Sequence, residues 1–135
     1  MTYETIKMEI TANPEYVSII RLTTSGIANK VGFCIDDIED LKVAISEACT
    51  NAIKHSSDDR FTIIYSMIEN GLTIEIIDNG KGYDRSSVSE QDIDNLQESG
   101  MGLFIIESLM DEVIVESQEG KGTSIKVITY LGVDM

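Results

Sequence analysis

The chain has 135 residues, of which 42% are hydrophobic, and its formal net charge is −14. This length and composition predict one globular domain over residues 1–135, and they exclude a disordered chain. No run approaches the roughly 18 apolar residues that a membrane span needs, and the acidic charge argues against direct nucleic-acid binding, which relies on basic surfaces. The charge either suits a partner with a basic surface or only keeps the protein soluble.

The N-terminus lacks the basic and apolar regions of a secretory signal. The two cysteines, Cys34 and Cys49, lack the spacing of a metal site. We therefore expect a cytoplasmic protein in which both cysteines are reduced, buried thiols.

The first predicted elements are a strand and a helix. Polar and apolar residues alternate in Thr5–Ile10, which predicts a strand with its apolar residues on one face. Pro14 suits the first turn of a helix, with Asn13 as its cap. We expect this helix to run to about Lys30, because Gly32 then breaks the pattern.

A second amphipathic helix is predicted next. Asp36 can cap it, and it should end near His55, before a polar turn over residues 56–59. Its apolar residues recur at helical spacing and predict the face that packs on a sheet. These residues are Ile38, Leu41, Ile45, Ala48 and Ala52.

The second half of the chain is predicted as two hairpins separated by a loop and a helix. Two β-rich runs, Phe61–Ile68 and Leu72–Ile77, flank an Asn70-Gly71 turn, which is a hairpin signal. Residues 84–98 are polar and have no sustained apolar period, so they indicate one long loop, of a length that often forms a lid. The remaining elements are a helix from about Met101 to Leu109 and strands near Val113–Ser117 and Thr123–Leu131.

This order of elements predicts the fold class. Strands joined by short hairpins imply a mostly antiparallel sheet, and helices on one face of that sheet complete a second layer. We expect an α+β fold, a two-layer α/β sandwich.

Three polar residues of the second helix, Glu47, Asn51 and His55, lie four positions apart and share one stripe. Glu47 is on the side turned away from the apolar face. The stripe is either a solvated flank or part of a site. In a site, the oxygen of Asn51 suits Mg²⁺, which prefers hard oxygen ligands, and the carboxylate of Glu47 suits a general base. We expect His55 to brace such a site rather than to take part in catalysis.

A glycine-rich motif, Asp78-Asn-Gly80-Lys-Gly82, stands at the end of a predicted strand. The carboxylate of Asp78 can accept a hydrogen bond from the exocyclic amino group of adenine. The two glycines remove side chains that would hold the backbone away from a flat base. The alternative is a plain turn, so this motif alone is not decisive.

Two further motifs complete the pattern. Gly100-Met101-Gly102 opens a helix whose free amides favour phosphate. Gly122-Thr123 begins the last strand, and the Thr123 side chain can reach the same base edge as Asp78. Each motif is common alone, but their joint order and spacing predict a nucleotide site.

Together the motifs resemble the N box and the three glycine boxes of the GHKL ATPases. Within that superfamily, Ser46–Ala52 and Ser99–Val113 are similar to the bacterial anti-sigma factor serine kinases of the RsbW/SpoIIAB family. Residues 14–23 and 37–42 look more like the RsbW group than the sporulation group. The resemblance covers nearly the whole chain.

The resemblance implies the Bergerat fold, a homodimer, and Mg·ATP-dependent phosphorylation of a serine on a STAS-domain anti-anti-sigma protein. It also implies sequestration of an alternative, sigma-B-like sigma factor in stress-response transcription. The matching positions are the general base Glu47, the Mg²⁺ ligand Asn51, the adenine-binding Asp78, Gly80 and Gly82, the phosphate-binding Gly100, Met101 and Gly102, Thr123 of the last box, and the partner-binding Arg21. Arg21 lies beside a stripe of Val17, Ile20 and Thr24 that we expect to form a shared dimer and partner surface.

Two departures from the family pattern keep other hypotheses open. The ATP lid, about residues 84–99, is shorter than is usual in the RsbW group, and Glu98 replaces an arginine that approaches the phosphates in the sporulation relative. The expected consequence is either slower catalysis or substitution by another cation, such as Lys81 or Arg85. A second hypothesis is a non-catalytic binding module that uses ATP as a conformational ligand. A third, the catalytic domain of a histidine kinase, is disfavoured because the chain has no room for a phosphoacceptor hairpin.

Overall fold

The computed structural model describes residues 4–56, 58–78, 102–118 and 122–132. Within these ranges the chain order of elements agrees with the sequence prediction. The elements are β1 (Thr5–Thr11), the short 3-10 helix η1 (Pro14–Tyr16), α1 (Val17–Val31), α2 (Ile35–His55), β2 (Arg60–Ile68), β3 (Gly71–Asp78), a helix over residues 102–109, β4 (Glu112–Gln118) and β5 (Gly122–Tyr130).

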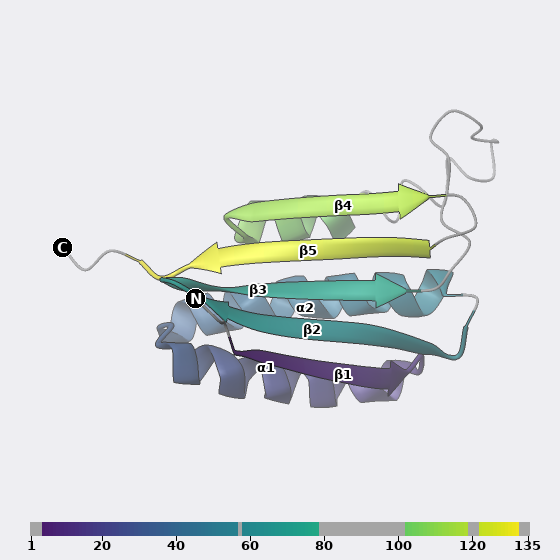
Figure 1. The fold of residues 1–135 in the computed structure, drawn as a ribbon, viewed down its shortest axis with the longest axis horizontal. Coiled ribbons are helices and arrows are strands. Elements are labelled where there is room, and N and C mark those ends of the chain that lie inside the picture. The colour runs from purple at the N-terminus through teal and green to yellow at the C-terminus, as the bar shows by residue number, and fades with distance from the viewer. Residues whose placement is uncertain (1–3, 57, 79–101, 119–121, 133–135) are drawn as a thin grey trace.

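The strands form one five-stranded sheet in the order β1-β2-β3-β5-β4, and every neighbouring pair is antiparallel. Figure 1 shows α1, α2 and the helix over residues 102–109 on the same face of this sheet. The predicted two-layer α+β sandwich is therefore confirmed. None of the helices described is long and apolar enough to cross a membrane.

The core lies between the helices and the sheet. All five predicted apolar residues of α2 are at most 7% exposed. They face the inward residues of the central strands, among them Phe61, Ile63 and Ile74, which are at most 1% exposed. Burial of each such side chain contributes about 1.5–3 kcal/mol, so this shared core fixes α2 against the sheet.

The start and end of the first helical segment follow the prediction. The Oδ1 atom of Asn13 accepts a hydrogen bond of 3.0 Å from the backbone N–H of Glu15, which caps η1 ahead of α1. Gly32 ends α1 with a φ of 113°, and its N–H donates to the carbonyl of Ala28 at 3.1 Å. This left-handed conformation costs glycine little, which is why the helix stops there.

The start of α2 differs from the prediction. The N-cap position is held by Cys34, in an extended conformation and without a side-chain capping bond. Asp36 is therefore not the cap. It lies in the first turn, where a carboxylate interacts favourably with the positive end of the helix dipole. The same position leaves Cys34 exposed, so the prediction of two buried thiols is wrong for Cys34 and confirmed for Cys49, whose burial raises the pKa of its thiol to about 12.

The first hairpin is confirmed, but Gly71 is required for a different reason than the expected turn. The pairing of Ile68 with Gly71 makes Glu69 and Asn70 the loop, and Asn70 takes the left-handed φ of 61°. Gly71 belongs to β3, and a Cβ atom there would collide with the carbonyl oxygen of Thr129 on β5. The close approach of β5, rather than the turn, requires glycine at this position.

The faces of α1 also differ from the expectation. Ile20 and Thr24 are completely buried, so the expected partner stripe packs into the core instead. The apolar residues that α1 exposes are Ile19, at 50%, and Leu22, at 74%. Arg21 is exposed as well.

The buried hydroxyl of Thr24 joins α1 to the sheet. It donates to the carbonyl of Ile20 at 2.8 Å and lies 2.8 Å from the hydroxyl of Tyr65 on β2. Because Thr24 has a single hydroxyl proton, Tyr65 donates to it. Burial raises the pKa of Tyr65 to about 12, so this donor stays protonated across the neutral range.

This geometry predicts unequal effects of two small substitutions. Thr24→Val leaves the hydroxyl of Tyr65 buried without its acceptor and should lower the free energy of unfolding by about 1–3 kcal/mol. Tyr65→Phe leaves Thr24 bonded to Ile20 and should cost less, about 0.5–1.5 kcal/mol. Urea unfolding of both variants and of the double variant measures this. The double variant should lose less than the sum, and a larger loss in Tyr65→Phe than in Thr24→Val would contradict the assigned donor.

Candidate active site

The elements that carry the predicted site residues meet at one end of the sheet. In Figure 1 the C-terminal end of α2, the end of β3 and the start of β5 all lie at the same end of the molecule. The antiparallel order β3-β5-β4 causes this, because the end of β3 then lies beside the start of β5. The helix over residues 102–109 begins farther along the sheet and runs away from this end, toward the start of β4.

Glu47 on α2 faces the first described residue of that helix. A Cβ atom built on Gly102 would lie 3.4 Å from Oε2 of Glu47, and both residues are at least partly buried. The sequence pattern put Glu47 on the side of α2 turned away from the apolar face. The structure shows that Gly102 covers part of this side, so the residue is not on a fully solvated flank.

Asn51 and His55 continue the stripe toward the end of α2. Asn51 is partly buried, next to the buried Ala52, whereas His55 is exposed. The stripe therefore brings the carboxylate of Glu47 to Gly102 and holds the amide of Asn51 one turn farther along α2. Both are hard oxygen donors, which fit Mg²⁺ or a reacting hydroxyl.

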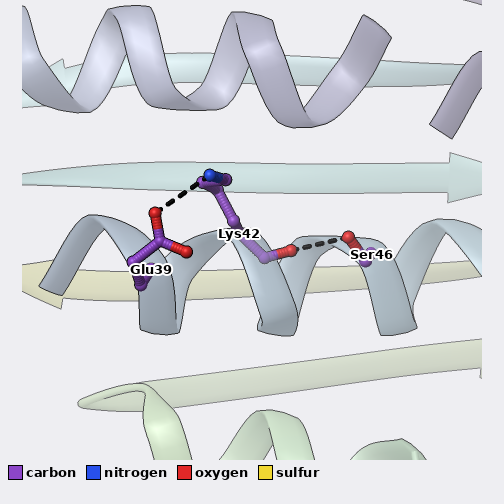
Figure 2. A network of polar contacts seen from close by, with 3 residues as sticks. All are labelled: Glu39, Lys42 and Ser46. Atoms are coloured by element: carbon purple, nitrogen blue, oxygen red, sulfur yellow. Dashed lines mark hydrogen bonds and ion pairs between the residues drawn. The ribbon is translucent and has the colours of Figure 1, made fainter. Parts of the chain in front are cut away.

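Ser46, immediately before Glu47, is occupied within its own helix. Its hydroxyl donates to the carbonyl of Lys42 at 2.7 Å, and the ammonium group of Lys42 pairs with Glu39 at 3.0 Å (Figure 2). A serine bonded to the preceding turn is a poor candidate for a reacting group. Of this adjacent pair, only Glu47 offers a side chain to the site.

Asp78 ends β3 with its side chain on the helix-covered face. It is only 6% exposed, and its cross-strand neighbours are Phe61 on β2 and Thr123 on β5. A carboxylate at this depth needs hydrogen-bond donors. Its position at the strand end is where a ligand with an exocyclic amino group would supply one.

Thr123 lies directly opposite Asp78 in the register and also has a partner on its other side. Its hydroxyl oxygen is 2.9 Å from the hydroxyl oxygen of Ser117 on β4. The structure thus places a carboxylate and two hydroxyls in one cross-strand row. Ser117 was not among the predicted site residues.

The remaining predicted site residues lie outside the described part of the chain. These are Gly80, Gly82, Gly100 and Met101, together with the lid over residues 84–99, Lys81, Arg85 and Glu98. Their roles stay predictions. Among the described residues, the structure brings Glu47 to Gly102 and Asp78 to Thr123.

Comparison with known proteins identifies the family. The model of the family described as the histidine kinase-like ATPase domain matches residues 10–129. The serine-protein kinase RsbW of Bacillus cereus (strain AH820) is 45% identical over 129 residues, and the match covers 87% of this chain and 81% of that protein. The chain belongs to the RsbW family. The RsbW of Bacillus thuringiensis (strain Al Hakam), another member, is 41% identical with the same coverage.

Solved structures have the same fold as this RsbW family member. A crystal structure of the RsbU and RsbW domains of a Mycobacterium tuberculosis protein matches 97% of this chain and 33% of its own chain, with a TM-score of 0.73 and 18% identity. The histidine kinase domain of a blue-light activated histidine kinase from Erythrobacter litoralis matches 90% of this chain and 62% of its own, with a TM-score of 0.59 and 20% identity. The predicted Bergerat-type fold is confirmed, and the RsbW family domain is one that uses ATP.

Proposed function

We propose that this RsbW family member phosphorylates a serine of a STAS-domain anti-anti-sigma protein with Mg·ATP and, as a cytoplasmic homodimer, sequesters a sigma-B-like sigma factor. The observation that carries the kinase proposal is the approach of Glu47 to Gly102. It sets a candidate base beside the start of a helix whose amides suit phosphate. The name serine-protein kinase of relatives at 45% identity supports the same reaction.

The catalytic end of the site consists of Glu47, Asn51 and the motif around Gly102. Glu47 accepts the proton of the attacking serine hydroxyl while the serine oxygen bonds to the γ-phosphorus of ATP, and the bond from that phosphorus to ADP, the leaving group, breaks. Asn51 would hold Mg²⁺ through its side-chain oxygen, and the ion would neutralise charge on the phosphates. The backbone amides at the start of the helix over residues 102–109, with Gly100 and Met101 preceding it, hold phosphate oxygens.

The other end of the site selects the base. Asp78 accepts a hydrogen bond from the exocyclic amino group of adenine, with Thr123 beside it on the neighbouring strand. Gly80 and Gly82 follow Asp78 in the chain and have no side chains that would hold the backbone away from the base. Guanine has a carbonyl oxygen in place of this amino group, so its edge meets the carboxylate of Asp78 with an acceptor instead of a donor, which costs about 1–3 kcal/mol.

A reconstituted reaction tests this function. We expect the purified chain with Mg·ATP and the STAS-domain protein to give a product that is one phosphate heavier, with the phosphate mapped by mass spectrometry to a serine. GTP should support the reaction poorly, and chelation of Mg²⁺ should stop it. A stable complex with the STAS-domain protein that yields no phosphoserine would instead favour the non-catalytic binding module.

The partner surface proposed here is the exposed side of α1. Ile19 and Leu22 expose apolar area on it, and Arg21, which precedes Leu22 in the chain, supplies an exposed positive charge. In a chain with a net charge of −14, an exposed arginine beside apolar residues suits a protein partner with acidic side chains.

Arg21→Glu should weaken binding of the sigma factor about 10- to 100-fold, because the change replaces attraction by repulsion. Affinity for ATP should stay unchanged, since α1 carries none of the nucleotide motifs. Titration of labelled sigma factor, together with ATP binding by the same variant, measures both effects.

Lys30→Glu provides a matched control, since it makes the same charge change at the other end of α1. Among the ion pairs that the structure describes, Lys30 pairs only with the exposed Glu4. This variant should leave sigma binding near wild type. Equal losses in the two variants would point to overall charge, and undiminished binding by Arg21→Glu would remove this surface from the proposal.

A further inference from the structure

The row of polar side chains across β3, β5 and β4 extends one strand beyond the recognised motifs. Cross-strand pairing sets Asp78 opposite Thr123, and Thr123 opposite Ser117. Directly opposed side chains lie on the same face with Cβ atoms about 4.5–5.5 Å apart. Thr123 therefore has the carboxylate of Asp78 on one side and the hydroxyl of Ser117 on the other.

The hydroxyl pair has two possible directions. Either Ser117 donates to Thr123 or Thr123 donates to Ser117, because the oxygens are 2.9 Å apart and either can be the donor. If Thr123 donates to Ser117, it presents only lone pairs toward the base. If Ser117 donates, the proton of Thr123 is available to an acceptor on its other side, either the carboxylate of Asp78 or a ring nitrogen of the base.

Adenine on one side, and hypoxanthine and guanine on the other, require opposite directions of the hydrogen bond between Ser117 and Thr123. The edge of adenine offers an amino donor and, next to it, a ring nitrogen that accepts. Asp78 suits the donor, so the neighbouring protein group must itself donate. Hypoxanthine and guanine carry a carbonyl and a protonated ring nitrogen at these two places, and a donor there would meet a donor.

We propose that Ser117 is a positioning residue for nucleotide recognition: by donating its hydroxyl proton to Thr123, it turns the proton of Thr123 toward the base and thereby favours adenine. This inference rests on the proposed nucleotide site. It adds a specificity-determining residue from β4, a strand that carries none of the recognised motifs.

The simpler explanation is an ordinary cross-strand pair that only stabilises the β4–β5 hairpin. Such a pair would change thermal stability and would weaken all nucleotides equally. A positioning role changes the ratio of affinities between adenine and hypoxanthine nucleotides. Equilibrium binding of ADP and of inosine diphosphate, measured by calorimetry without any turnover, separates the two explanations.

Ser117→Ala should weaken ADP binding about 3- to 10-fold, the loss typical of one hydrogen bond, and should leave inosine diphosphate binding unchanged. Ser117→Thr and Ser117→Val form a matched pair, since both are β-branched and suit a strand but only threonine keeps the hydroxyl. Ser117→Thr should retain the wild-type preference for ADP, and Ser117→Val should lose it. The Val variant also keeps the test decisive if the Ala variant loosens the strand.

Ser124→Ala is the control, because Ser124 lies in the same hairpin but pairs with Ile77 and Glu116 on the opposite face of the sheet. It should leave both affinities unchanged. An unchanged ADP preference in both Ser117→Ala and Ser117→Val would overturn the role of Ser117 while the nucleotide site stands. Absence of any Mg·ADP or Mg·ATP binding by the wild-type chain would overturn the site itself and this inference with it.

Discussion

Glu47→Gln should lower phosphoryl transfer to the STAS-domain serine about 10²–10⁴-fold while Mg·ATP still binds. Glutamine keeps the size of the side chain but has no basic oxygen to accept the serine proton. Glu47 on α2 lies against Gly102. A change that keeps the size of its side chain should therefore leave the helix over residues 102–109 in place. Single-turnover transfer and calorimetric ATP binding measure the two properties separately.

The control for this substitution is Glu39→Gln on the same helix. Glu39 pairs with Lys42 at 3.0 Å on an exposed part of α2, and the change should leave transfer near wild type. Sigma binding should persist in both variants. Transfer by Glu47→Gln at the wild-type rate would show that Glu47 is not the base.

Asp78→Asn should weaken ATP binding at least about 10²-fold. A charge-assisted hydrogen bond to the base, worth about 1.5–3 kcal/mol, is lost, and the new amide donor then meets the amino donor of adenine in a buried position. Because Asp78 is only 6% exposed, water cannot readily replace the lost contact. Calorimetry with ATP and GTP measures the change.

The expected signature is loss of base selectivity rather than loss of fold. The wild-type chain should bind ATP well and GTP poorly, whereas Asp78→Asn should bring the two affinities close together. The unfolding midpoint of the variant without nucleotide should be measured alongside. Equal ATP and GTP affinity in the wild-type chain would mean that the base site has been assigned to the wrong residues.

Patterns that depend on one element were predictable from the sequence. The helical spacing of α2 gave both its buried face and the stripe of Glu47 and Asn51, because side chains three and four residues apart share a face. Asp78 was placed correctly at the end of a strand, since the alternation of apolar residues and the turn residues after it mark that end. The two predicted hairpins, β2–β3 and β4–β5, account for two of the four neighbouring strand pairs in the sheet.

The errors arose where contacts distant in sequence decide the outcome. α1 has apolar residues on two sides, and its packing against α2 and against Tyr65 of β2 decides that Thr24 is buried while Leu22 is exposed. The need for glycine at Gly71 comes from β5, about sixty residues later in the chain. Ser117 was missed for the same reason: a serine in a strand has no distinctive pattern until the register sets it opposite Thr123.

The strand order leaves β1 and β4 as the outer strands of the described sheet, each with one neighbour. Unpaired strand edges can template aggregation unless charge or shape prevents a second chain from adding. Exposed glutamates occupy both strands, Glu9 on β1 and Glu112 and Glu116 on β4, in a chain whose calculated isoelectric point is about 4.2. Mutual repulsion of these carboxylates therefore protects the edges at neutral pH. Near pH 4.2 the net charge of the whole chain falls to zero and repulsion between chains is lost, so colloidal stability depends on the same acidic composition that disfavours nucleic-acid binding.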